Sequence, residues 1–113
     1  MQNLFVRPRQ QQIYQLSIIC PSMSLGHARR EIRGLIQKNG LRIQQWLEQP
    51  QAVATGSSPA LSPWLISADF RCSSETCMHL LQGIAVRLGS MPLTRIKLDC
   101  LSAFANDHRA RAI

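Results

Sequence analysis

Apolar residues recur with a period of two in four stretches of the sequence, and with the longer period of a helix in two stretches between them. The first period is typical of strands with one buried face, and the second is typical of amphipathic helices. The strands are expected at 13–20, 41–48, 64–72 and 94–101. The helices are expected at 25–38 and from Ser73 or Ser74 to Gly89. The order strand–helix–strand–strand–helix–strand restricts the fold more than any other feature.

This order has one simple solution when the crossover connections are right-handed. The solution is a ferredoxin-like α+β sandwich, in which a four-stranded antiparallel sheet of order 4-1-3-2 carries both helices on one face. The 113 residues suffice for one domain but not for two. We expect this domain to occupy 13–104, with a lead-in at 1–12 and a loose tail at 105–113.

The second predicted strand is more polar than the others. Leu41, Ile43 and Leu47 alternate there with Trp46 and polar residues, a pattern typical of an edge strand. We expect Trp46 to form part of an interaction surface. The stretch Pro50–Pro63 is rich in Gly, Ser, Pro and Ala, which predicts a long loop before the third strand.

Each predicted helix has one apolar stripe. In the first helix it comprises Leu25, Ala28, Ile32, Leu35 and Ile36. In the second helix it is expected at Cys77, Leu81, Ile84 and Leu88. Ser22 and Ser24 are candidate N-caps of the first helix. Asn39 and Gly40 should end it, because both residues tolerate positive φ.

Thirteen Lys and Arg residues against six Asp and Glu residues give a formal net charge of +7. Such a balance favours an anionic neighbour, which could be nucleic acid, a phospholipid surface or an acidic protein. Arg29, Arg30 and Arg33 form a cluster on the polar side of the first predicted helix. We expect these three side chains to contact anions or a lipid surface.

The sequence lacks the residue patterns of catalytic and metal sites. The cysteines have no CxxC spacing and fall at inward positions, so they are expected to be reduced core thiols. They are Cys20, Cys72, Cys77 and Cys100. The three histidines, His27, His79 and His108, lie on separate predicted segments, and the six acids form no pair spaced for acid–base work. We therefore expect no enzymatic activity, no cofactor and no metal.

Nucleic-acid binding is the first alternative function. Ferredoxin-like RNA-recognition domains stack bases on aromatic side chains of the two central strands. The outer positions of the first and third predicted strands hold Gln15, Ser17, Ile19, Leu65, Ser67, Asp69 and Arg71. Because none is aromatic, sequence-specific RNA recognition is disfavoured. Unspecific phosphate binding through the arginine cluster stays open.

Short stretches of the chain resemble one protein family. The segment Asn3–Pro8 resembles the Asn-Leu-Leu-Leu-Arg-Pro type of sequence that ends the last transmembrane helix of MgtC/SapB-family proteins. Tyr14–Cys20 then resembles the strand that follows in that family, and Val86–Leu93 resembles its Arg-Leu helix end and short turn. The resemblance covers about Asn3 to Phe104.

This resemblance implies an ACT-like fold and a non-catalytic regulatory or protein-interaction role in adaptation to low magnesium. The chain would be the C-terminal cytoplasmic domain of an inner-membrane protein, beside anionic lipid headgroups. Its partners would be a protein or its own membrane domain, and a homodimer through sheet edges is expected. A ligand-sensing ACT domain is the second alternative. The segment Cys20–Ser24 lacks the acidic residue and glycine of amino-acid-binding ACT domains, which argues against an amino-acid effector.

Overall fold

A computed structural model describes residues 10–52 and 58–101. These residues form the strands β1 (Gln12–Pro21), β2 (Ile43–Pro50), β3 (Pro63–Cys72) and β4 (Arg95–Cys100). They also form the helices α2 (Leu25–Lys38) and α3 (Ser74–Leu88) and the short 3-10 helices η2 (Ser22–Ser24) and η3 (Pro59–Leu61). The motif Asn3–Pro8 and the tail expected at 105–113 lie outside the described residues.

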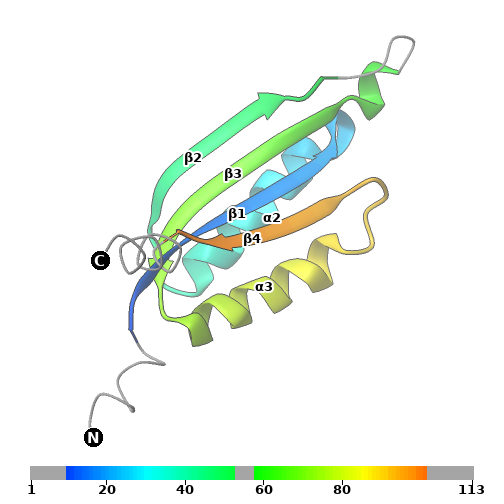
Figure 1. The fold of residues 1–113 in the computed structure, drawn as a ribbon. Coiled ribbons are helices and arrows are strands. Elements are labelled where there is room, and N and C mark those ends of the chain that lie inside the picture. The colour runs from blue at the N-terminus through cyan, green and yellow to red at the C-terminus, as the bar shows by residue number, and fades with distance from the viewer. Residues whose placement is uncertain (1–9, 53–57, 102–113) are drawn as a thin grey trace, which may run out of the picture.

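The strands form an antiparallel sheet in the order β2-β3-β1-β4, with β1 and β3 in the centre. Both helices cover one face of this sheet, and the opposite face is open (Figure 1). The predicted βαββαβ order, the 4-1-3-2 sheet and the shared helical layer are therefore confirmed. Neither α2 nor α3 is long and apolar enough to cross a membrane.

The core lies between the sheet and the two helices. Its buried side chains come from alternate positions of β1 and β3 and from one stripe on each helix, as the two periodicities predict. The largest of them are Phe70, Leu16, Ile18, Ile32, Ile36, Ile66, Leu80, Ile84 and Leu88. Ile96 and Leu98 of β4 pack against this core from the edge of the sheet.

The predicted alternation of β2 is wrong beyond Ile43. Ile43 pairs with Phe70 and Trp46 pairs with Ala68, so three steps along β2 match two steps along β3. This irregularity is a β-bulge, and it reverses the side on which later residues of β2 lie. Trp46 therefore packs against the core on the helix side, whereas Leu47 is 43% exposed.

The helix ends and stripes differ from the predictions at two places. Ser24 occupies the N-cap position of α2 without a side-chain hydrogen bond, whereas Ser73 caps α3 and accepts one from the Thr76 amide. In α3, Leu80 is buried in place of the predicted Leu81, which is only half-buried. The predicted end of α2 is confirmed, because Gly40 has a φ of 72°.

Candidate functional site

The arginine cluster of α2 meets the edge strand β2. Arg29 pairs with Glu48 through two hydrogen bonds, from Nε to Oε2 and from Nη2 to Oε1, both 2.7 Å long. A two-pronged contact of this kind fixes the plane of the guanidinium as well as its position. Arg29 is thus bound to the strand beside it.

Trp46 contacts both Glu48 and Arg33 on this edge of the sheet. The Trp46 indole Nε1 donates to Glu48 Oε2 at 2.9 Å, and the Arg33 guanidinium lies over the indole ring, 4.2 Å from its centroid. A guanidinium over an aromatic face is attracted by the electrons of the ring. The hydrogen bond from Arg29, aided by that from Trp46, lowers the pKa of the Glu48 carboxyl below its usual value.

Two other cations, Arg30 and Lys38, lie beside these contacts. The side chains of Arg30 and Lys38 make no ion pair or hydrogen bond within the described part of the chain. Together with Glu31 and Arg87 they line a hollow of about 200 Å³ between α2 and α3. Glu31 is already engaged by Arg87, whose Nη1 lies 2.8 Å from Glu31 Oε1. The hollow therefore holds two cations that form no ion pair, although the Arg30 charge helps to lower the pKa of Glu31.

The structure thus separates the three predicted anion-binding arginines. Arg29 and Arg33 are held against Glu48 and Trp46, whereas Arg30 makes neither an ion pair nor a ring contact within the described residues. Lys38, two helical turns along from Arg30, was not predicted. A helical spacing of eight residues could have identified it, since such residues share a face. We define the α2 basic face as Arg29, Arg30, Arg33 and Lys38.

The cysteines are free thiols, as predicted, and three of them lie in the core. Burial raises the pKa of the Cys77 thiol to about 12, and it also raises the pKa of Cys72 and Cys20. Nucleophilic cysteines need the opposite shift, because the thiolate is the reactive form. Cys100 is half-buried, and its thiol donates to Gln12 Oε1 at 2.8 Å. We therefore assign the four cysteine side chains a role in packing.

The open face of the sheet has no platform for stacking bases. Because side chains alternate along a strand, the aromatic residues of the central strands, Tyr14, Trp64 and Phe70, point toward the helices. Apart from Ile19 and Leu65, the outer positions named above hold polar side chains, among which Gln15 Nε2 donates to Asp69 Oδ1 at 3.1 Å. His27 and His79 lie on different helices, and the described residues contain no group of three His, Cys, Asp or Glu able to hold a metal.

Comparison with known proteins identifies the fold. No protein-family model and no curated protein matches the sequence. Similar structures include an unknown protein from Galdieria sulphuraria, at TM-score 0.63 and 10% identity, over 80% of this chain and 50% of that chain. The C-terminal domain of the MgtC protein from Mycobacterium tuberculosis matches at TM-score 0.59 and 13% identity, over 80% of this chain and 88% of that chain.

The ligand-free regulatory subunit of aspartate kinase from Thermus thermophilus also matches, at TM-score 0.52 and 12% identity, over 80% of this chain and 54% of that chain. This chain therefore spans about half the length of the Galdieria and Thermus chains. Likeness at such low identity carries information about the fold alone. The chain has an ACT/ferredoxin-like fold and a distant structural match to the MgtC C-terminal domain.

Proposed function

We propose that this chain is a non-catalytic regulatory or protein-interaction domain, the cytoplasmic C-terminal part of an MgtC/SapB-like inner-membrane protein. One observation carries the proposal: the described fold matches 88% of the MgtC C-terminal domain from Mycobacterium tuberculosis. The short resemblance at Asn3–Pro8, directly before the fold, supports the same origin. The link to low magnesium rests on that family resemblance.

The chemistry of the described residues favours binding over catalysis. The raised pKa values of the buried thiols keep them protonated, and Glu48 is engaged by Arg29 and Trp46. A general base or nucleophile needs a group that is free to react near neutral pH. We infer that the fold presents surfaces to other molecules and does not carry out chemistry on them.

The α2 basic face supports a position beside anionic lipid. Each Lys or Arg close to an anionic membrane contributes about 1 kcal/mol of attraction. Arg30 and Lys38 are the members that make neither an ion pair nor an aromatic contact within the described residues. They are therefore the residues expected to contribute most.

Cell fractionation tests the membrane origin. An antibody to this domain should detect, in the source organism, a protein longer than 113 residues that sediments with the membranes. Disruption of its gene should slow growth when magnesium is limiting and leave growth unchanged when magnesium is ample. A species of 113 residues that stays in the supernatant would contradict the proposal.

Vesicle binding tests the lipid contact separately. The double variant Arg30→Gln/Lys38→Gln should bind vesicles of phosphatidylglycerol and phosphatidylcholine roughly tenfold more weakly than the original chain. Its matched control is Arg71→Gln/Lys97→Gln, which loses the same charge from the open face of the sheet. Equal weakening of both variants would mean that net charge alone acts. Tighter binding to single-stranded RNA than to vesicles at the same salt would favour the nucleic-acid alternative.

A further inference from the structure

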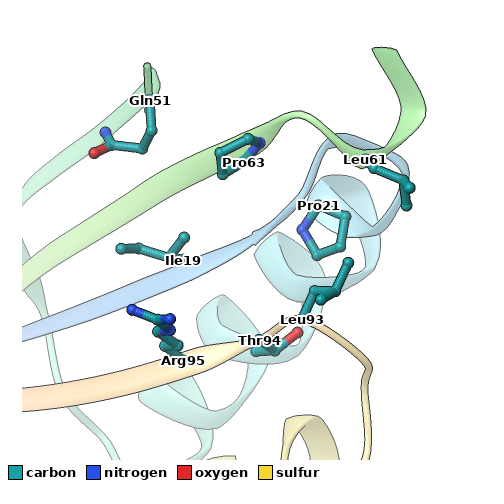
Figure 2. A pocket seen from close by; sticks show the side chains of 8 residues that line it. All are labelled: Ile19, Pro21, Gln51, Leu61, Pro63, Leu93, Thr94 and Arg95. Atoms are coloured by element: carbon teal, nitrogen blue, oxygen red, sulfur yellow. The ribbon is translucent and has the colours of Figure 1, made fainter. Parts of the chain in front are cut away.

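A pocket lies on the open face of the sheet, on the side away from the helices and from the α2 basic face. It is found where β1 ends and where β3 and β4 begin (Figure 2). Its volume is about 490 Å³, within the range of small-molecule sites. Five of its lining residues are apolar and three are polar. They are Ile19, Pro21, Leu61, Pro63, Leu93, Gln51, Thr94 and Arg95.

The central part of the pocket is formed by rigid, paired backbone. Pro21 and Pro63 face each other at the end of the central ladder, and the amide of Gln51 donates to the Pro63 carbonyl at 2.9 Å. The Ser22 amide donates to the Ser62 carbonyl at 2.7 Å just beyond the two prolines. Because a proline ring fixes its own φ, this end of the sheet has little freedom to collapse into the space.

Two exposed leucines stand at the rim. Leu61 belongs to η3 and is 46% exposed, and Leu93 belongs to the turn before β4 and is 67% exposed. Leu93 also has a φ of 59°, in the left-handed region that leucine rarely occupies. Backbone strain of this kind is found preferentially at binding sites. The rim therefore exposes apolar surface that a ligand would cover.

Arg95 is the one charged residue among the described residues that line the pocket. It is paired across the strands with Ile19, beside which its side chain extends (Figure 2). Within the described part of the chain its guanidinium makes no ion pair and no hydrogen bond. None of the lining residues that the structure describes is Asp or Glu. A free guanidinium next to apolar walls is complementary to a carboxylate that carries an apolar body.

We propose that this pocket binds a small aliphatic monocarboxylate, with the carboxylate on Arg95 and the hydrocarbon between Ile19, Leu61 and Leu93. A zwitterionic amino acid fits less well, because the described lining offers no acidic side chain to receive its ammonium group. The site goes beyond the proposed membrane-domain function. It would make this open face a ligand-responsive surface of the fold.

Amide chemical shifts of the full chain, titrated with octanoate, test the proposal. Saturable shifts are expected at Ile19, Leu61 and Leu93. 1-Octanol and leucine should bind at least tenfold more weakly, because the first lacks the charge and the second adds an unmatched ammonium group. Arg95→Gln should weaken octanoate binding roughly tenfold to a hundredfold, since a charge-assisted hydrogen bond is lost. Arg95→Lys should recover part of the affinity.

Lys97→Gln is the matched control, because Lys97 lies on the same strand and the same face but does not line the pocket. It should leave octanoate binding unchanged, and thermal unfolding should show that all the variants fold. Equal weakening by Arg95→Gln and Lys97→Gln would overturn the proposal, as would octanol or leucine binding as tightly as octanoate. Shifts that do not saturate, or that avoid Leu61 and Leu93, would overturn it as well.

Discussion

At the scale of single residues, Tyr14 reports on the integrity of the core. Its side chain is only 6% exposed, and its hydroxyl donates to Gln12 Oε1 at 3.3 Å. Burial, followed by the neighbouring Cys100, raises its pKa from 10.0 to about 12. The phenolate is thus disfavoured in the folded chain, because it would have to leave water.

Because the folded chain holds the Tyr14 proton more tightly than the unfolded chain does, stability is complete below pH 10.0 and falls as the pH rises toward about 12. Tyr14 is the sole tyrosine of the sequence, so tyrosinate absorbance reports on it alone. We expect a midpoint near pH 12 for the native chain and near 10.0 in urea. A native midpoint near 10.0 would contradict the burial of the hydroxyl.

Glu48 should make stability sensitive to acid. Its pKa is lowered from 4.5, mainly by the hydrogen bonds from Arg29. The contribution of the Arg29–Glu48 pair is therefore complete above pH 4.5 and is lost as the pH falls through the lowered value. Glu48→Gln should flatten this part of the pH–stability curve measured by urea unfolding. Glu75→Gln, a change in the first turn of α3, is the control; identical curves for the two variants would exclude the pair as the cause.

At the scale of elements, two glycines of the α2 region should respond oppositely to alanine. Gly40 ends the helix with a φ of 72°, where a side chain costs about 1 kcal/mol. Gly34 lies within α2, and a Cβ there meets nothing within 4 Å. Gly40→Ala should lower the free energy of unfolding by about 1 kcal/mol, whereas Gly34→Ala should raise it by about 0.5–1 kcal/mol. Urea unfolding measures both. No loss of stability in Gly40→Ala would refute the assignment of the helix end, and a loss in Gly34→Ala would contradict the open space at Gly34.

The element order and most boundaries could be predicted from sequence because each element buries one regular face. The bulge in β2 could not, because the extra residue falls among Gln44 and Gln45, where no apolar pattern marks the change of side. Leu80 and Leu81 stand three and four residues after Cys77. Both spacings fit a helical stripe, so only packing against the sheet selects Leu80.

The candidate sites could be predicted from the sequence less completely than the fold. The arginine cluster was visible as a run of charge, but Glu48 lies nineteen residues from Arg29 and meets it only because of the bulge. The open-face pocket is assembled from the ends of β1, β3 and β4, the residue after β2, η3 and the turn before β4. No motif links these segments, because their proximity is a property of the antiparallel register.

At the scale of the whole molecule, the two edges of the sheet differ in how well they are protected. β4 carries Arg95 and Lys97, and charged side chains at an edge discourage pairing with another chain. β2 contains no lysine or arginine, and its outward Leu47 is 43% exposed. We therefore expect a second copy of the chain to associate with the β2 edge of the sheet, beside the contacts around Trp46.

Antiparallel pairing of two β2 strands about a twofold axis would bring Leu47, near the middle of the strand, close to its own copy. Leu47→Lys would then place like charges opposite each other, which is destabilising in a sheet. Light scattering should give a dimer mass for the original chain at micromolar concentration and a monomer mass for Leu47→Lys. Met78→Lys, at an exposed apolar position on α3, should remain dimeric. A monomer mass for the original chain, or loss of the dimer in Met78→Lys, would show that β2 does not mediate association.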